Sequence, residues 1–409
     1  MRRTIFYFVA FALCTNVFAE GYQVNLQGNR QTGMGHAGTG LNLGASSIHF
    51  NPGALALMKT KSEFSLGGSL IFGKNTFQKQ GSDYVAQTDN PIGTPFYFYG
   101  ATKLNDKLAI GLGVTTPYGN SLKWDDKWDG RFLIQGISLK AIYVQPTISY
   151  AINEMISIGA GPVLAYGDVK LSKGLPLSDA VGEGSAELNG NTMAYGFNAG
   201  IYLQPTPELS FGMSYRSKIN MKLDEGTASF DVPDVLIGST SFPAETKFNA
   251  ELPLPANLVF GAGYKVSDKL TLALDLQYVF WSTYDSLNFD FEFNSPSLAD
   301  SKNARNYENT LVYRLGAEYK VTDKFMGRAG FAYDSTPITK GYLTPETPGA
   351  NKFNYTLGLS YKFTEGLSVD VSFLFIKAQE RKDGYADANF YGTYNTTAVI
   401  PGFGINYSF

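Results

Sequence analysis

The sequence predicts an all-β protein, a bacterial outer-membrane barrel of fourteen antiparallel strands, and three observations predict it. Alternating apolar runs stop at six short polar turns, seven longer polar connections alternate with those turns, and no segment has the roughly 20 consecutive apolar residues that a membrane helix needs. Alternate connections of an up-and-down sheet fall on opposite edges, so the short turns and the long loops lie at two different ends. An even number of strands with this asymmetry is typical of outer-membrane barrels.

The connections give the strand count. Each short turn contains Asp or Glu and ends on an apolar residue, and thirteen connections join fourteen strands. The short turns are 104–108, 152–156, 205–209, 266–270, 321–325 and 363–367, and the long connections are near 75–93, 118–136, 171–190, 225–246, 291–304, 336–350 and 381–393. We expect both chain ends on the side of the short turns, the periplasm.

The strands alternate as a lipid-facing wall requires. Successive side chains of a strand face opposite sides, and Leu272, Leu274 and Leu276 alternate with Asp275 and Gln277. The 30 Phe and 26 Tyr recur at strand ends, where aromatic girdles meet the two interfaces. The alternative is a secreted β-sandwich, but its chain reverses every 8 to 12 residues or so. The alternating end of the chain, 403–409, is typical of substrates of the outer-membrane barrel-assembly machinery.

The beginning of the chain divides into three parts. Arg2, Arg3 and an apolar run before Ala19 predict a secretory signal peptide over residues 1–19, so the protein is exported through the periplasm. The only cysteine, Cys14, leaves with it. Residues 20–60 are rich in Gly, Asn and Ser and contain no long alternating strand, so we expect a hatch, a plug inside the lumen, followed by the barrel over 61–409.

We expect no cofactor, although one glycine motif in the hatch matches a pattern found in nucleotide-binding proteins. Residues 33–38 match G-x-G-x-x-G, but a dinucleotide site needs a preceding buried strand, a following helix and an acidic residue about 20 positions on. None of these is present. The glycines are better explained by tight turns in a confined lumen.

The hatch carries the resemblance to a known family. GYQVNLQGNRQTGMGHAGTG followed by SSIHFNPGALA resembles the hatch of the FadL family of outer-membrane transporters for long-chain fatty acids and hydrocarbons. The family's Asn-Pro-Ala motif is matched by Asn51 and Pro52, with Gly53 in place of Ala. Segments 128–161, 252–284 and 314–338 extend the resemblance through the barrel.

The resemblance implies a transport route for a long-chain fatty acid or another hydrophobic small molecule. Loops capture the ligand, a pocket against the hatch holds it, and it leaves sideways where the third strand is kinked. That strand is predicted near 108–116, where Gly111 and Gly113 can take a distortion and form the lateral gate. The alternative is that these glycines only give the hatch room.

Four residues are candidates for ligand binding. Leu374 and Ile376 fall on the lumen face of their strand, and Trp281 shares the inward face of Asp275. Arg131 can hold a carboxylate bidentately. The alternatives are that Trp281 packs on the hatch and that Arg131 is solvated or contacts lipopolysaccharide. A further lumen-facing set of charged residues predicts a salt-bridge network that holds the hatch: Asp275, Arg314, Glu318, Arg328 and Asp370.

Other functions are less consistent with the sequence. An enzyme could use Ser46 or Ser47 with His49, but both histidines, His36 and His49, lie in the hatch and lack a third orienting group. No cluster suggests a metal site. A polar-solute porin needs opposed rows of charge rather than a plug. We expect a monomer surrounded by outer-membrane lipid and lipopolysaccharide, and the net charge of −3 gives no sign of nucleic-acid binding.

Overall fold

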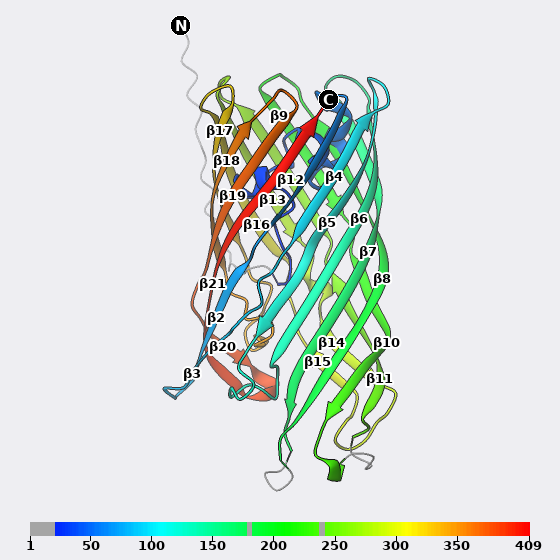
Figure 1. Ribbon diagram of the computed structural model, residues 1–409, viewed down its shortest axis with the longest axis vertical. Helices are drawn as coiled ribbons and strands as arrows, with labels where there is room; N and C mark the ends of the chain where they lie inside the picture. Colours follow the sequence, from blue (N-terminus) through cyan, green and yellow to red (C-terminus); the bar gives the residue numbers. More distant parts are fainter. Residues whose placement is uncertain (1–20, 178–181, 237–241) are drawn as a thin grey trace.

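A closed β-barrel, longer than it is wide, forms the molecule (Figure 1). The computed structural model describes residues 21–177, 182–236 and 242–409, so the predicted signal peptide lies outside the described residues. Every described strand belongs to one antiparallel sheet, which closes by pairing Phe64 with Tyr407 and Leu66 with Ile405. The barrel has the predicted fourteen strands. No described helix is long and apolar enough to cross a membrane.

Seven of the fourteen strands are single elements, and seven consist of two consecutive elements separated by a short break. The single ones are β5 (Leu108–Lys123), β6 (Gly136–Ala151), β7 (Ile156–Leu175), β8 (Gly184–Leu203), β17 (Phe325–Asp334), β18 (Lys352–Lys362) and β21 (Phe390–Ser408). The divided ones are β1 (Ser62–Ser69) with β2 (Phe72–Lys79), β3 (Val85–Gln87) with β4 (Phe96–Lys103), β9 (Leu209–Arg216) with β10 (Ile219–Asp231), β11 (Glu245–Leu254) with β12 (Asn257–Lys265), β13 (Leu270–Val279) with β14 (Ser286–Phe291), β15 (Ser301–Ala304) with β16 (Thr310–Lys320), and β19 (Leu367–Ala378) with β20 (Arg381–Tyr385). Two 3-10 helices lie in the long connections, η3 (Asp234–Leu236) and η5 (Ala386–Ala388), and a third, η4 (Trp281–Thr283), lies in the break between β13 and β14.

All six predicted short turns join neighbouring strands at one end of the barrel, which also holds the C-terminus (Figure 1). Each turn uses a polar side chain to accept backbone N–H groups two or three residues later. Asn105 accepts from Lys107 and Leu108 at 2.9 Å each, and Ser267 and Thr322 act in the same way in their turns. The sequence pattern therefore reflects local hydrogen bonding as well as chain reversal.

The predicted long connections are partly wrong in extent. The segment 171–190 was expected as a loop, but β7 continues to Leu175 and β8 begins at Gly184. Likewise β5 continues to Lys123 inside the expected loop 118–136. These segments are polar because their outer faces meet water beyond the membrane. A strand needs only backbone pairing, so it continues past the apolar band.

Within the apolar band that faces the membrane, the predicted outward and inward faces of the strands are confirmed. Leu274 on β13 is 50% exposed and Leu357 on β18 is 61% exposed, because both face outward. Asp275, the neighbour of Leu274, is 2% exposed and faces the lumen. The outer surface is thus apolar and the inner surface polar at this height, as a membrane barrel requires.

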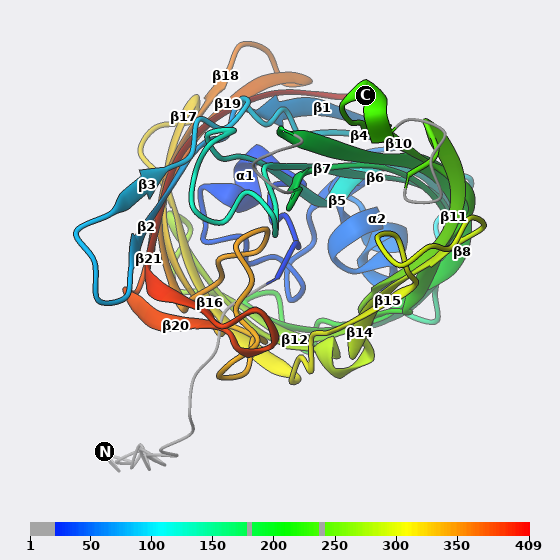
Figure 2. The same cartoon turned by 90° about the horizontal axis from the view of Figure 1, so that it is seen from below.

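Residues 21–60, here called the hatch segment, lie inside the barrel (Figure 2). The segment contains only short helices: α1 (Asn29–Thr32), η1 (Gly44–Ser46), α2 (Ser47–Phe50) and η2 (Pro52–Leu57). The hatch segment comes closest to the barrel wall at positions where the wall strand has a glycine. A Cβ placed on Gly212 of β9 would overlap the Thr39 carbonyl, and one placed on Gly33 would lie 2.8 Å from the Gly358 Cα on β18. Backbone therefore packs on backbone.

We expect Gly212→Ala to displace the hatch segment. The added methyl group has no space beside Thr39, and overpacking of this kind costs roughly 1–3 kcal/mol. The measurement is the melting temperature of the folded barrel together with protease cleavage within residues 21–60. Gly327→Ala is the matched control, because a Cβ there meets only Val321 at 4.0 Å. Equal stability and equal protection in both variants would contradict the close packing.

Candidate functional site

The Asn51-Pro52-Gly53 turn fixes the hatch segment to the wall. Asn51 is fully buried, and its amide donates to the carbonyls of Thr39 and Ile201 at 3.0 Å each while its oxygen accepts from Gly53 N. The Gly53 carbonyl accepts from Ser157 Oγ at 2.6 Å. A Cβ on Gly53 would lie 2.8 Å from the Gly200 carbonyl oxygen, so the glycine permits a contact that alanine would obstruct.

Charged side chains hold the other side of the hatch segment. Arg30 in α1 pairs with Glu318 at 2.8 Å, and Glu318 also accepts from Arg328 at 2.6 Å. Arg328 continues to Asp370 at 2.9 Å. Asp275 instead accepts the backbone N–H groups of Gly38 and Thr39 at 2.9 and 3.0 Å. Three of the five predicted members, Glu318, Arg328 and Asp370, thus form ion pairs, and Arg30, which was not predicted, joins them.

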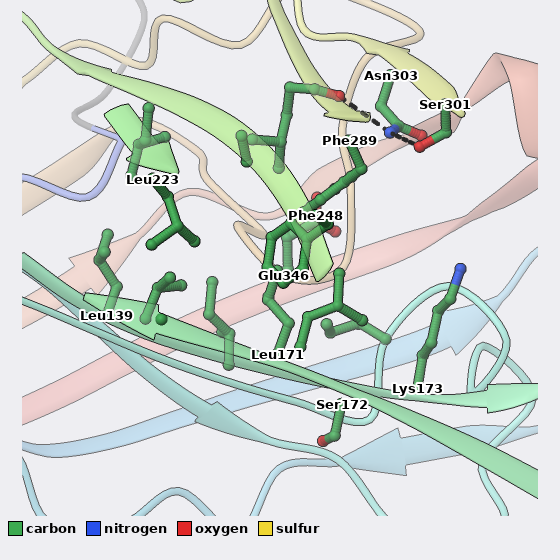
Figure 3. Close-up of a pocket in the computed structure, with 18 of the residues that line it drawn as sticks. Leu139, Leu171, Ser172, Lys173, Leu223, Phe248, Phe289, Ser301, Asn303 and Glu346 are labelled. Atoms are coloured by element: carbon green, nitrogen blue, oxygen red, sulfur yellow. Dashed lines mark hydrogen bonds between the residues drawn. The ribbon is translucent and has the colours of Figure 1, made fainter. Parts of the chain in front are cut away.

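An apolar cavity of about 320 Å³ lies in the half of the barrel that carries the long connections (Figure 3). The strands β6, β7, β8, β10, β11 and β14 supply its wall, and Tyr22 of the hatch segment closes its inner end. Leu139, Leu171, Leu223 and Phe248 converge on the space in Figure 3. The volume and the apolar lining are those of a site for a small hydrophobic ligand.

These cavity residues were not predicted, although the sequence contains a signal for them. Above the membrane the strands turn their apolar side chains inward and their polar ones outward. On β11, Phe248, Ala250 and Leu252 line the cavity, whereas Lys247 and Asn249, the two neighbours of Phe248, are exposed. The same inversion occurs on β14 and in the outer half of β8. A reversal of the alternation within one strand is therefore the pattern that marks the cavity.

The polar groups at the cavity are mostly satisfied. Arg305 pairs with Glu346 at 2.7 Å, and both line the cavity. Asn303 donates to the Leu287 carbonyl at 3.0 Å (Figure 3). Because Arg305 already has a carboxylate partner, it does not require a ligand anion to balance its charge.

The four predicted ligand-binding residues are not brought together, and none lines this cavity. Trp281 is fully buried with its ring 4.9 Å from Tyr22, so it packs on the hatch segment. Leu374 and Ile376 pack with Leu26 on another part of the lumen. Arg131 lies over the Phe132 ring at 4.4 Å, two residues before Leu133 of the cavity lining. Their role in ligand binding stays a prediction.

The sheet is interrupted between β4 and β5. Their pairing ends at Tyr97 and Thr115, and β5 carries one extra residue relative to β6 between Thr115 and Tyr118, a β-bulge. Beyond this point β5 pairs with the hatch segment: the Pro117 carbonyl accepts from Val24 N at 2.8 Å. The edge of β5 turns from its neighbouring strand toward the lumen.

Gly111 and Gly113 do not form this interruption, and their role as a lateral gate stays a prediction. Both pair without a break with β4 and β6. A Cβ on either residue would contact Ile48 of the hatch segment, at 2.5 Å for Gly111 and 2.9 Å for Gly113. These glycines give the hatch segment room. The break instead lies at the bulge, where the hatch segment takes over the pairing of β5.

Comparison with known proteins agrees with this geometry. Residues 10–409 match the model of one protein family, outer membrane protein transport protein (OMPP1/FadL/TodX). The chain belongs to this family. It is therefore an outer-membrane transporter of hydrophobic compounds, and the predicted location in the outer membrane is confirmed.

Curated relatives and solved structures cover nearly the whole chain. Outer membrane protein P1 of Haemophilus influenzae is 26% identical, covering 89% of this chain and 90% of the relative. A long-chain fatty acid transport protein of Escherichia coli is 23% identical, covering 98% and 97%. The structure of a Pseudomonas aeruginosa FadL homologue has a TM-score of 0.82 at 20% identity, covering 95% of this chain and all (100%) of the other. The toluene transporter TodX of P. putida has a TM-score of 0.76 at 16% identity, covering 96% and 99%. These structures support the fold.

The residues considered for catalysis have other partners. His49 Nδ1 lies 3.1 Å from the Arg216 guanidinium, whereas Ser46 contacts Gln31 and Ser47 accepts from Leu43 N. Burial and the neighbouring Arg216 hold the pKa of His49 well below its usual value, so this ring is neutral at neutral pH. The described residues contain no group of three side chains suited to bind a metal ion. A family of transporters agrees with the expectation of a non-enzyme.

We expect Glu318→Gln to loosen the hatch segment without unfolding the barrel. The variant leaves Arg30 without its carboxylate and Arg328 with only Asp370. Hydrogen exchange of residues 29–36 should speed up by about tenfold or more, which corresponds to a local loss of about 1.4 kcal/mol. Glu365→Gln is the control, because Glu365 is 97% exposed in a turn. Unchanged exchange in Glu318→Gln would show that the network does not hold the segment.

Proposed function

We propose that this protein takes long-chain fatty acids across the outer membrane by capture in the apolar cavity, transfer past the hatch segment and lateral exit through the barrel wall. The observation that carries the proposal is the inverted wall above the membrane, which is polar outside and apolar inside. Such a wall buries an acyl chain and is of no use to a polar solute. Relatives named as long-chain fatty acid transport proteins add support.

The hatch segment directs the route sideways. Its backbone contacts the wall around the lumen, through Gly33 to β18, Thr39 to β9 and Gly53 to β8. An axial passage would require these contacts to separate. The interruption between β4 and β5 lies beside the segment at Val24, so a small shift of residues 22–24 opens a path from the lumen toward lipid. We propose this interruption as the lateral gate.

We expect purified protein in liposomes to take up oleate and to exclude small sugars. Phe289→Asp should lower oleate binding by about tenfold or more, because a carboxylate in the apolar cavity is costly to bury and repels the ligand. Asn288→Asp is the matched control. It adds the same charge one residue away, on the exposed face of β14.

Three outcomes decide between the functions. Oleate uptake that Phe289→Asp abolishes and Asn288→Asp leaves intact supports the cavity as the capture site. Free passage of sugars through the wild-type protein would instead establish a porin for polar solutes. Equal loss of binding in both variants would show that the added charge acts at a distance and that the cavity is not the site.

A further inference from the structure

One arginine inside the barrel has no carboxylate partner. Arg216 is the last residue of β9, and its guanidinium donates to the His49 carbonyl at 3.1 Å and lies beside His49 Nδ1. Its carbon Cζ is 6.0 Å from the centre of the Tyr143 ring. Arg216 forms no ion pair in the described part of the chain, and its Nε is buried without a hydrogen-bond partner.

Unlike Arg216, the other lumen arginines with a described ion pair each have a carboxylate partner. Arg30, Arg305, Arg328 and Arg381 each contact a carboxylate within 4 Å. A charge inside a protein is costly unless it is paired, so folds usually provide a counterion. At Arg216 the fold supplies a carbonyl, an imidazole nitrogen and an aromatic face, and it leaves the Nε–H donor unused.

Two neutral histidines of the hatch segment lie near Arg216, and no described carboxylate pairs with it. His36 is 8% exposed, and neither of its ring nitrogens has a partner. The rings of His36 and His49 are 6.4 Å apart, and burial holds the pKa of both well below the usual value. His36 further has a φ of 62°, a backbone conformation uncommon for residues other than glycine.

Arg216 lies at one end of a row of aromatic side chains that starts at the cavity and passes the interruption in the wall. Tyr22 lines the cavity and lies 6.1 Å from Tyr118 by ring centres, Tyr118 lies 6.0 Å from Tyr143, and Tyr143 carries the Arg216 contact. Tyr118 is also the residue at which β5 resumes its register after the bulge.

We infer that Arg216, beside the neutral ring of His49, forms a carboxylate-binding site next to the lateral gate, and that this site receives the head group of an amphipathic ligand arriving from the apolar cavity. The inference rests on the proposed function and makes it more specific, because it requires a carboxylate head group. Arginine presents its donors in a planar fork that matches a carboxylate, and the free Nε–H is one of them. A neutral hydrocarbon gains nothing from this site.

The test compares two ligands with the same tail. Uptake of palmitate and of methyl palmitate is measured in liposomes for the wild-type protein, Arg216→Gln and Arg216→Lys. In Arg216→Gln, palmitate uptake should fall by about tenfold or more while methyl palmitate uptake stays at the wild-type rate. Arg216→Lys keeps the charge without the fork, so palmitate uptake should recover in part. Lys218→Gln is the control, because it removes an exposed positive charge two residues away.

Every other outcome contradicts the inference that Arg216 binds the carboxylate of the ligand. Equal uptake of both ligands in Arg216→Gln would show that no carboxylate binds there. Equal loss of both would show that Arg216 only supports α2 and the hatch segment. A wild-type protein that takes up neither ligand would overturn the proposed function itself, which distinguishes the two failures.

Discussion

The structure depends on close packing between the backbone of the hatch segment and a barrel wall that presents glycine to it. Gly212 of β9 and Gly358 of β18 leave no space for a side chain, so the segment lies directly against the wall. Two further interactions hold it: the buried amide of Asn51 and the ion pairs from Arg30 through Glu318 to Asp370. Because the hatch segment occupies the lumen, a ligand has to pass it. The positions of the cavity and the lateral gate follow from this requirement.

The wall changes character along its length, and this change separates the membrane from the binding region. Near the short turns its outer face is apolar and its inner face carries charged and polar groups for the hatch segment. Near the long connections the faces exchange roles, and the cavity forms. The same period of two serves both regions. Only the phase differs, and the bulge in β5 shows how one inserted residue changes that phase.

The sequence predicted the fold more completely than the site. Local signals were sufficient for the six turns, because residues such as Asn105 bond to amides only two or three positions away. The lumen faces of Asp275, Arg314 and Glu318 followed from alternation. Arg216 was missed because its lack of a counterion is a long-range property, set by which strands surround it. Gly111 and Gly113 were predicted as the gate because glycine permits a kink, whereas the actual break arises where Pro117 follows Thr116 and the hatch segment takes over the pairing.

The central claim is that ligands leave through the interruption beside Pro117, and deletion of that residue tests it most directly. The deletion removes the extra residue of the bulge, so β5 can keep one register with β6. Oleate uptake into liposomes should fall by about tenfold or more while equilibrium binding of oleate to the cavity is unchanged, and Pro117→Ala, which keeps the residue count, should transport normally. Undiminished uptake in the deletion variant, with its barrel folded, would contradict the lateral route.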